Sequence, residues 1–531
     1  MNQSQVSASV LSRCDVERLI AEENALIVIM DQMVLRLDGW LKYHPGGSKP
    51  IQHMVGRDAT DEITSLHSPK TCRQMKRYQI GRVQGYWENL IPPIQGCVYP
   101  IASESVNTSS KPKVTIPCAR GAANTTFRPP DSPTSRHTEG TRFLDFLTRE
   151  EINLDLTEYP LVDKSTQMEI TCKYRLLHEE IRRSGLYQCN YTAYAWEAMR
   201  CALLVSLTWL FMNLEVYWIS AAFLGLFWSQ LVFIAHDAGH MGITHNFTID
   251  TLIAMIIAAP IGGLSMGWWK RSHNVHHIVT NSPEHDPDNQ HLPLFAVNHR
   301  FLGNLFSTYH ERWMRFGRIA KFWIPYQAKM YYLVLAFGRF NLYAQSWLFL
   351  IRGQGPRKGA AWWHRLFEIF GVIIFCLWYG YGLVYKSIPG NWNRITFVMV
   401  SHMVNMPLHV QFTLSHFAMS AMDLGQDESF AQKMLRTTMD IDCPEWLDFF
   451  HGGLQFQAVH HLFPRIPRHN LRSTQKFVQQ FCRETGIPYA LYGFVDGNKK
   501  VLGCLSAVSR QAAILAECQR TVAADQQSSV S

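Results

Sequence analysis

Three clusters of closely spaced histidines are the residues of this sequence best suited to chemistry. The densest cluster is HNVHH at residues 273–277, and the others are HDAGH at 236–240 and QAVHH at 457–461. On a helix, His273 and His277 lie on one face, whereas His276 and His277 diverge by about 100° around the axis. One helix could therefore present imidazoles to two metal ions.

Imidazole-rich sites bind Zn, Cu, Fe or Ni, and the spacing of the histidines does not select among these metals. A single i, i+4 pair of histidines also occurs on solvated helix surfaces and at helix ends, where it binds nothing. Here all three clusters lie at the polar edge of a hydrophobic segment. We therefore predict that the clusters converge on one metal site.

Four apolar segments are each close to the ~20 residues that a membrane-spanning helix requires. They are residues 197–214, 216–235, 366–385 and 395–413. Two of them precede the first histidine cluster and two more precede the third, so a cytosolic N-terminus places every cluster on the cytosolic face. Residues 250–267 are also apolar, but a crossing there would separate the first two clusters, and we predict an interfacial or re-entrant hairpin instead.

The composition favours a membrane protein with sizeable soluble parts. The formal net charge is +8, and basic pairs such as Lys270-Arg271 and Arg357-Lys358 fall on the predicted cytosolic side, as the positive-inside rule expects. Basic residues alternate with acidic ones and no recognition motif appears, which argues against nucleic-acid binding. The cysteines form no CxxC pair and the first residues contain no apolar leader, so we expect the N-terminal part to stay in the cytosol.

The N-terminal part carries a second candidate cofactor site. Two short predicted strands precede His44-Pro45-Gly46-Gly47, a sequence that would hold a histidine on a tight loop open to a flat ligand. Together with His67, this pattern resembles a cytochrome b5 domain over residues 22–90. The resemblance implies that His44 and His67 bind the iron of haem b axially, with His53 as a competing second ligand.

Changes in composition divide the chain into predicted parts. A Pro- and Ser-rich stretch with few large apolar groups is typical of a flexible linker, and the polar end of the chain is typical of a disordered tail. The predicted parts are an N-terminal tail at 1–21, the haem domain at 22–90, the linker at 91–141, a membrane domain at 142–500 and a C-terminal tail at 501–531.

The histidine clusters and the haem domain occur together in one family. The order HDAGH, HNVHH and QAVHH resembles that of front-end membrane desaturases acting on fatty-acyl and sphingolipid chains, which carry an N-terminal cytochrome b5 domain and a glutamine at the start of the third cluster. The resemblance is strongest to the fungal sphingolipid Δ8-desaturases. It implies an α-helical integral membrane desaturase with four transmembrane helices and a cytosolic cap, fused to a small α+β cytochrome b5-like domain.

The resemblance also implies a centre of two non-haem Fe ions held mostly by histidines. Carried over position by position, the catalytic and metal-binding residues are His236, His240, His273, His276, His277, His460 and His461, with Gln457 at the start of the third cluster and His416 as an additional ligand. Weaker candidates are His402 and His409 in the fourth apolar segment, and His245, His285, His291, Asp237 and Asp286 as residues that orient the ligands.

The implied function is a sphingolipid Δ8-desaturase that uses O2 to introduce a double bond into the long-chain base of a ceramide-type lipid. The haem domain would supply electrons received from NADH-cytochrome b5 reductase, at the endoplasmic reticulum membrane with both termini and the active site in the cytosol. Three alternatives stay open: a front-end fatty-acyl Δ5 or Δ6 desaturase, a hydroxylase, and a non-enzymatic membrane haem- or lipid-binding protein. The sequence does not choose among ceramide, glucosylceramide and free base, or between a cis and a trans product.

Overall fold

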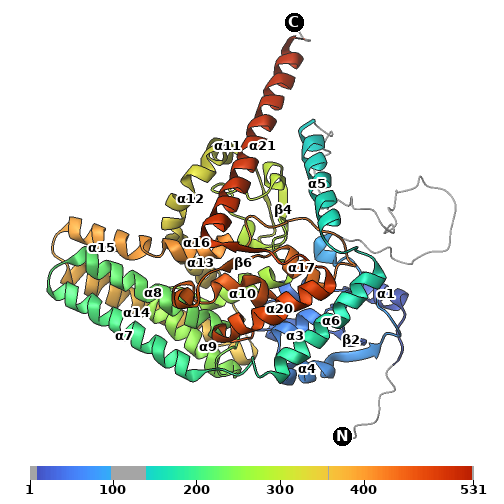
Figure 1. Cartoon of the computed structure of the whole chain (residues 1–531), viewed down its shortest axis with the longest axis horizontal. Helices are drawn as coiled ribbons and strands as arrows, with labels where there is room; N and C mark the ends of the chain where they lie inside the picture. Colours follow the sequence, from blue (N-terminus) through green and yellow to red (C-terminus); the bar gives the residue numbers. More distant parts are fainter. Residues whose placement is uncertain (1–8, 97–138, 357, 529–531) are drawn as a thin grey trace.

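The computed structural model describes residues 9–96, 139–356 and 358–528, and these residues form a mostly helical molecule (Figure 1). Apolar helices form an elongated lobe at one end, and the small N-terminal domain lies at the other. The histidine-bearing helices lie between the two. The predicted fold class, a helical membrane protein with a small α+β domain at its N-terminus, is confirmed. Residues 97–138, which make up most of the predicted linker, lie outside the described residues.

The N-terminal domain is built on a three-stranded antiparallel sheet. Asp31 and Gln32 adopt left-handed backbone conformations, which give the two-residue turn between the first two strands the twist that a hairpin requires. Short helices that follow the second strand carry the two loops with His44 and His67. The elements are β1 (Ile27–Met30), β2 (Met33–Arg36), α2 (Lys49–Gln52), α3 (Thr60–Leu66), α4 (Pro69–Met75) and β3 (Gln79–Arg82).

Helix α1 (Arg13–Glu23) belongs to this domain, although the sequence suggested a tail before residue 22. Its start is fixed by a capping box in which Ser12 and Asp15 bond to each other's backbone N–H groups. Val16 and Ile20 on its inner face are fully buried against the sheet residue Ile29. The hydrophobic face of the helix thus forms one side of the domain core.

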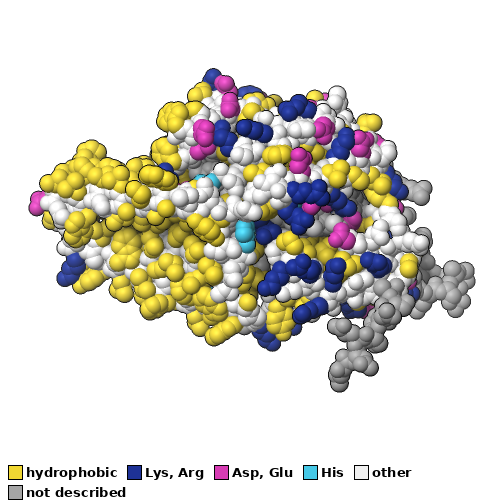
Figure 2. Space-filling model, turned by 60° about the horizontal axis from the view of Figure 1, so that its bottom comes forward, with side chains coloured by type: hydrophobic (Ala, Val, Ile, Leu, Met, Phe, Trp, Pro, Cys, Tyr) yellow, Lys and Arg dark blue, Asp and Glu magenta, His cyan; other side chains and the backbone are white. Residues whose placement is uncertain are grey.

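The apolar lobe consists of helices that lie side by side in Figure 1. Its surface is covered by hydrophobic side chains, whereas charged side chains gather on the rest of the molecule (Figure 2). Trp209 and Phe370, for example, are 67% and 64% exposed, which suits contact with lipid rather than water. The helices are α7 (Tyr191–Asn213), α8 (Tyr217–Gly239), α14 (His364–Phe375) with a π-helical continuation (Cys376–Lys386), and α15 (Asn391–Met403).

Four helices in the described part of the chain are long and apolar enough to cross a membrane, but the fourth is not the predicted one. They are Tyr191–Asn213, Tyr217–Gly239, Gly359–Lys386 and Phe494–Thr521. The predicted span at 395–413 is instead divided into α15 and α16 (Met406–Leu414). Pro407 explains the break, because it has no N–H to continue the helix. Even so, α15 lies beside α8 in the apolar lobe (Figure 1).

The structure of the C-terminal residues also differs from the prediction. The sequence predicted a tail after residue 500, disordered beyond about residue 511, but residues 494–528 form one helix, α21 (Phe494–Ser528). Val501, Leu505 and Val508 are buried in a core with Tyr331 of α12 (Gln327–Ala336). The helix extends away from the apolar lobe (Figure 1). A polar composition at the end of the chain thus concealed an amphipathic helix with one buried face.

Residues 250–267 form a short apolar helix and a turn, α9 (Phe247–Ile256) with a π-helical continuation (Ile257–Ile261). These fifteen residues rise only about 22 Å, which is less than the ~30 Å hydrocarbon core of a bilayer. The chain then turns directly into α10 (Met266–Ile278), which carries the second histidine cluster. The length favours the predicted hairpin over a crossing.

The remaining elements surround the histidine-bearing segments. Helices α5 (Glu139–Glu158) and α6 (Lys164–Arg183) occupy the region predicted as a cytosolic cap, and α6 packs against α20 (Leu471–Thr485). The other helices are α11 (Arg318–Trp323), α13 (Gly338–Arg352), α17 (Phe430–Arg436), α18 (Asp448–His451) and α19 (Gln457–Leu462). The other strands pair as β4 (Leu305–Ser307) with β5 (Arg312–Met314) and β6 (Asp440–Asp442) with β7 (Leu491–Gly493).

Candidate metal centre and haem site

Helix ends bring the three histidine clusters together at the boundary of the apolar lobe. The first cluster occupies the last turn and the C-cap of α8, the second occupies α10, and the third occupies α19. His416 follows the end of α16 and joins them. The clusters on α10 and α19 are 185 residues apart in sequence yet have imidazoles in contact, so the tertiary structure creates a site that no single segment contains.

The first group of imidazoles contains residues from all three clusters. One nitrogen from each lies within 4.8 Å of the others, and the members are His236, His240, His273 and His460. The ring centre of His460 is 4.7 Å from that of His236 and 4.7 Å from that of His240. This arrangement could hold one metal ion.

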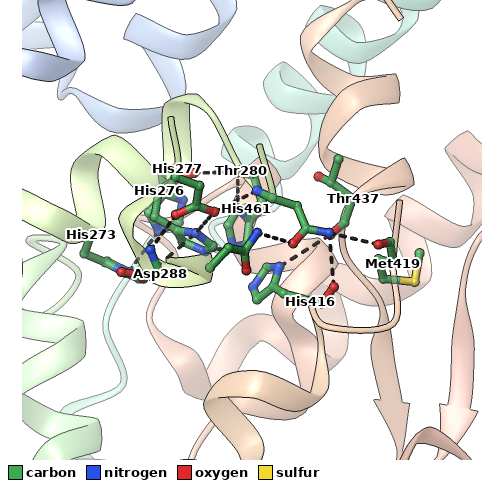
Figure 3. A network of polar contacts seen from close by, with 12 residues as sticks. His273, His276, His277, Thr280, Asp288, His416, Met419, Thr437 and His461 are labelled. Atoms are coloured by element: carbon green, nitrogen blue, oxygen red, sulfur yellow. Dashed lines mark hydrogen bonds and ion pairs between the residues drawn. The ribbon is translucent and has the colours of Figure 1, made fainter. Parts of the chain in front are cut away.

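A second group contains His276, His416 and His461, again with nitrogens within 4.8 Å of one another. His276 Nε2 lies 3.2 Å from His461 Nε2, and His416 lies close to both (Figure 3). Two nitrogens bound to one ion at about 2.1 Å are about 3.0–3.4 Å apart at usual coordination angles. The spacing therefore fits a second metal ion.

His277 lies between the two groups. Its Nε2 atom is 3.1 Å from His273 Nε2, and its ring centre is 4.9 Å from that of His240 and 4.4 Å from that of His461. Helical geometry predicts this position, because His276 and His277 leave the helix in different directions. Gln457 begins α19, one turn before His460, and its side chain is buried.

Unpartnered nitrogen atoms support metal binding. His240 Nε2, His277 Nδ1 and His460 Nε2 are buried and have no hydrogen-bond partner in the described structure. A buried polar atom without a partner is costly, and a metal ion at these positions would remove the cost. The donor set is rich in imidazole, which suits the late first-row metals including iron.

Burial keeps most of these imidazoles neutral. It lowers the pKa of His273, His277, His460 and His461, and neighbouring histidines lower these pKa values further. Neutral imidazole is the form that binds metal.

His276 differs from these histidines. Burial alone would lower its pKa, but the carboxylates of Asp286 and Asp288 outweigh burial and raise the pKa to about 9. His276 Nδ1 donates to Asp286 Oδ2 at 2.7 Å, which fixes the ring and leaves Nε2 facing His461. A carboxylate in this position makes the imidazole a stronger electron donor.

Several residues that support the site were not found from the sequence. Asp288 lies 3.9 Å from the Nδ1 atoms of His273 and His276, and Asn281 Nδ2 donates to the carbonyl oxygen of His416 at 3.1 Å. Asp288 could have been predicted from the sequence, because several acidic residues around Asp286 follow a histidine cluster directly. Nothing in the sequence indicated Asn281, because the carbonyl oxygens that its side-chain N–H groups bind lie more than 130 residues away.

Asp237 supports the first cluster through a buried network. It accepts hydrogen bonds from Tyr194 Oη at 2.5 Å and from Arg468 Nη1 at 2.6 Å, and Arg468 also pairs with Glu197. Because Arg468 follows the third cluster in the chain, the network ties the α8 end to the segment after α19. Asp237 thus holds together the backbone segments that carry the histidines, and it does not orient one imidazole ring directly.

The weaker histidine candidates lie in other environments. His402 bonds to the carbonyl oxygen of Val398 and stacks on Phe340, and the His409 ring packs against Gly338. His245 bonds to the carbonyl oxygens of Met241 and Tyr187. His285 contacts the Thr308 hydroxyl, and the His291 ring lies near that of Phe417. None of the five belongs to either group of metal-binding nitrogens in the described residues.

The haem-type domain places His44 and His67 close together, with their ring planes tilted by 39°. Their ring centres are 6.1 Å apart. An ion bound at about 2 Å by one nitrogen of each ring keeps the nitrogens about 4 Å and the ring centres about 6 Å apart. His53, the competing candidate, instead bonds to Gln95 Nε2 and has its ring 5.2 Å from His285.

Backbone carbonyls orient both candidate haem ligands. His44 Nδ1 lies 2.7 Å from Gly47 O, and His67 Nδ1 lies 3.1 Å from Ile63 O. Burial lowers the pKa of His67 to about 4 and lowers the pKa of His44, so both rings are neutral at pH 7. Each ring therefore keeps an unprotonated Nε2, the form that bis-histidine ligation of haem iron requires.

The two candidate sites lie on parts of the molecule that pack together. Val275 and Ile278 of α10, with Val279 directly after it, are buried in a core that also contains residues of the haem-type domain, such as Leu35 and Met54. The same interface contains the ion pairs Lys49–Glu311 and Arg175–Asp61. The helix with the central histidine cluster is thus part of the surface on which the N-terminal domain rests.

Imidazole groups at the end of an apolar helical lobe, with a haem-type domain packed against them, define a membrane-bound redox enzyme. The profile of the fatty acid desaturase family matches residues 190–493, and that of the cytochrome b5-like haem/steroid binding domain matches residues 12–84. The chain belongs to the fatty acid desaturase family and is an oxidoreductase that acts on lipid chains.

Several named desaturases resemble the chain over most of its length. It is 54% identical to a Delta 8-(E)-sphingolipid desaturase of Emericella nidulans over 98% of both chains. It is 47% identical to the protein of the same description from Komagataella phaffii, over 97% of this chain and 96% of the relative. An acyl-lipid (9-3)-desaturase of Borago officinalis is 29% identical over 89% of this chain and 88% of the relative.

Proposed function

We propose that the protein is a sphingolipid Δ8-desaturase that forms a trans double bond in the long-chain base of a ceramide-type lipid. The observation that carries this proposal is the 54% identity, over 98% of both chains, to a relative described as a Delta 8-(E)-sphingolipid desaturase. The (E) in that description is the basis for the trans product. The Borago relative favours an acyl chain as the second candidate substrate, but its identity is only 29%.

The proposed cofactors are two non-haem Fe ions and one haem b. One iron would be held by the group of His236, His240, His273 and His460, and the other by His276, His416 and His461, with His277 between the two. His44 and His67 would hold the haem iron. The bound iron pair would supply the oxidising power for the reaction, in which a –CH2–CH2– unit, O2, two electrons and two protons give –CH=CH– and two water molecules.

The chain itself positions and shields these groups. The Asp286 and Asp288 carboxylates set the orientation and basicity of His276, and the surrounding buried residues keep water from the centre. The apolar lobe brings a lipid chain to the histidines from the membrane side. The haem-type domain, resting on α10, shortens the path for electrons and replaces a bimolecular encounter by an intramolecular contact.

The protein is a membrane protein, and we propose the endoplasmic reticulum as its location with both termini and the active site in the cytosol. All three histidine clusters meet at one end of the apolar lobe. Because the span predicted at 395–413 is divided, a cytosolic active site requires α15 to return the chain through the membrane between the second and third clusters. Proposed partners are O2, the sphingolipid substrate, membrane lipid and NADH-cytochrome b5 reductase, and no nucleic acid. The proposed domains remain those assigned from the sequence, with α1 added to the haem domain and α21 added to the membrane domain.

The test is expression in a yeast that lacks the activity, followed by mass spectrometry of long-chain bases. We expect a Δ8-trans-unsaturated base to appear with the intact chain and to be absent with His461→Ala. New Δ5 or Δ6 double bonds in acyl chains, with unchanged bases, would contradict the proposal and favour the second candidate. A hydroxylated base without unsaturation would identify a hydroxylase.

A further inference from the structure

Both haem-binding loops contact the segments that carry the metal-centre histidines. A Cβ added at Gly46, two residues after His44, would come 2.5 Å from the Asn274 Nδ2 atom of the second cluster. On the other side, Arg465 Nη1 donates to the carbonyl oxygen of His67 at 3.0 Å, and Arg465 follows the third cluster by four residues. Each haem loop thus meets a different metal-bearing segment.

Two cations from these same segments reach the haem loops and form no salt bridge within the described residues. Lys270 of α10 lines a cavity of about 40 Å³ together with Pro45 and Gly47, and its Nζ atom is buried without a hydrogen-bond partner. Arg465 is 7% exposed, and its Nε atom is also buried without a partner. Among the described residues, neither side chain has a carboxylate within 4 Å, unlike Lys49, which pairs with Glu311 at 2.5 Å in the same interface.

A buried cation without a salt-bridge partner is unfavourable. The carboxylate of Asp250 acts electrostatically on both cations, but it forms no salt bridge with either and accepts hydrogen bonds from the backbone N–H groups of Thr244 and His245. The pair of cations therefore points to an anionic ligand that the chain does not supply. Glu368 lines the cavity beside Lys270, but its carboxylate accepts hydrogen bonds from Ser265 Oγ and Gly267 N. The ligand proposed for the adjoining loops is haem b, whose ring system carries two propionate carboxylates. Two carboxylates match the two cations, Lys270 and Arg465, in number and are opposite to them in charge.

We propose that Lys270 and Arg465 bind the two propionate groups of the haem, so that the cofactor itself clamps the haem domain onto the metal-bearing helix and loop. This proposal rests on haem binding by His44 and His67. It makes Lys270 and Arg465 positioning residues that act on the haem and not on the lipid. Cations beside the propionates also raise the reduction potential of the haem, because they offset the negative charge that reduction adds.

The test uses the full-length protein loaded either with haem b or with its dimethyl ester, in which both propionates are uncharged. Lys270→Met and Arg465→Met are compared with Lys49→Met, which removes a cation that already has a carboxylate partner. The readouts are the haem absorption spectrum, the midpoint potential and the rate of haem transfer to excess apomyoglobin. The spectrum tests haem binding itself, so failure of the proposed cofactor is distinguishable from failure of this inference.

With haem b, we expect each of Lys270→Met and Arg465→Met to lower the midpoint potential and to release haem roughly tenfold faster, as loss of a charge-assisted hydrogen bond would. Both effects should shrink strongly with the dimethyl ester, because the mutated cation then has no carboxylate to lose. Lys49→Met should change neither readout. The conservative variants Lys270→Arg and Arg465→Lys should keep most of the wild-type potential, which separates charge from folding.

Effects of equal size with haem b and with the ester would overturn the proposal, as would an unchanged haem-transfer rate in both variants. Measurements in neutral and in anionic detergent-lipid micelles test the other source of an anion. If the variants differ from wild type only in anionic lipid, the two cations bind lipid phosphate and the haem clamp is wrong.

Discussion

The haem pair and the metal centre both consist of imidazoles that burial keeps neutral, with His276 as the exception, but different partners orient them. At the haem pair, backbone carbonyls of Gly47 and Ile63 accept from the Nδ1 atoms of His44 and His67. At the metal centre, the carboxylate of Asp286 accepts from His276. A carbonyl fixes a ring without adding charge, whereas a carboxylate also strengthens the donor, which suits a centre that has to activate O2.

The two sites also differ in how much of the chain they need. The haem pair lies within one small domain, and its loops are held by a local sheet and short helices. The metal centre draws on α8, α10, α19 and the segment after α16, and it exists only when all four are packed. We therefore expect the haem pair to survive changes that destroy the metal centre.

The largest effect that is confined to one site is expected from His461→Ala, which should disrupt the metal centre and leave the haem site intact. His461 contributes to the second imidazole group and contacts no acidic residue in the described structure, so its removal weakens metal binding without freeing a buried charge. Product should fall to background and the content of non-haem iron should drop, while the haem spectrum stays unchanged. His402→Ala, another buried histidine outside both groups, is the control. Persistent turnover in His461→Ala would contradict the ligand assignment.

The opposite result is expected from His67→Ala, which should disrupt the haem site and leave the metal centre intact. Haem should be lost while non-haem iron is retained, because the metal centre contains no residue of this domain. With free cytochrome b5 and reductase added, we expect turnover to fall roughly 10- to 100-fold, because a tethered donor is replaced by a dilute one. Absorption spectra, iron analysis and product assays measure the three effects. His53→Ala is the matched control, and loss of haem there in place of His67→Ala would assign the ligand to His53.

Asp286→Asn keeps the size of the side chain but removes the charge next to His276. We expect metal affinity or turnover to fall about 10- to 100-fold, the usual cost of losing such a partner. Chelator competition measures the affinity, and Asp496→Asn on the exposed surface serves as the control. An unchanged metal affinity would show that the Asp286 carboxylate does not contribute to metal binding by His276.

The pH dependence of metal binding should report the same carboxylates. Because the pKa of His276 is raised to about 9, a metal ion has to displace a proton from it at neutral pH. Affinity should therefore rise with pH, by up to about tenfold per unit, until about pH 9. In Asp286→Asn the pKa falls towards its ordinary value, so the slope between pH 7 and 9 should flatten. Equal slopes in the two proteins would contradict this account.

The smallest effect is expected from Gly46→Ala, which changes the contact between the sites and also brings a methyl group to 3.0 Å from His44 Cε1. The added methyl group would lie 2.5 Å from Asn274 Nδ2, so the haem loop has to move away from α10. We expect turnover to fall a few-fold with an unchanged content of non-haem iron and only a small change in the haem spectrum, because the His44 ring has to shift slightly. The double variant Gly46→Ala with Asn274→Ala removes the clash and should recover most of the activity. No recovery would place the effect of the alanine within the haem loop itself.

Much of the candidate site followed from the sequence, because helix geometry converts spacing into direction. The i, i+4 pairs and the adjacent pairs of histidines predicted which rings share a face, and HPGG with His67 predicted the haem pair. The apolar segments near residues 197–235 and 366–385 were long and uniform enough to predict helices. The helical end of the chain was missed because α21 is apolar on only one face and is surrounded by polar composition.

The sequence by itself determined the kinds of residue available for each cofactor and the segments that carry them, since residue type and local periodicity are properties of short stretches. Only the tertiary structure decided that His416 joins His276 and His461, that Asp286 and Asp288 set the charge of one ring, and that Lys270 and Arg465 meet the haem loops. Those choices depend on packing between residues tens to hundreds of positions apart, and such packing has no signature in a single stretch of chain.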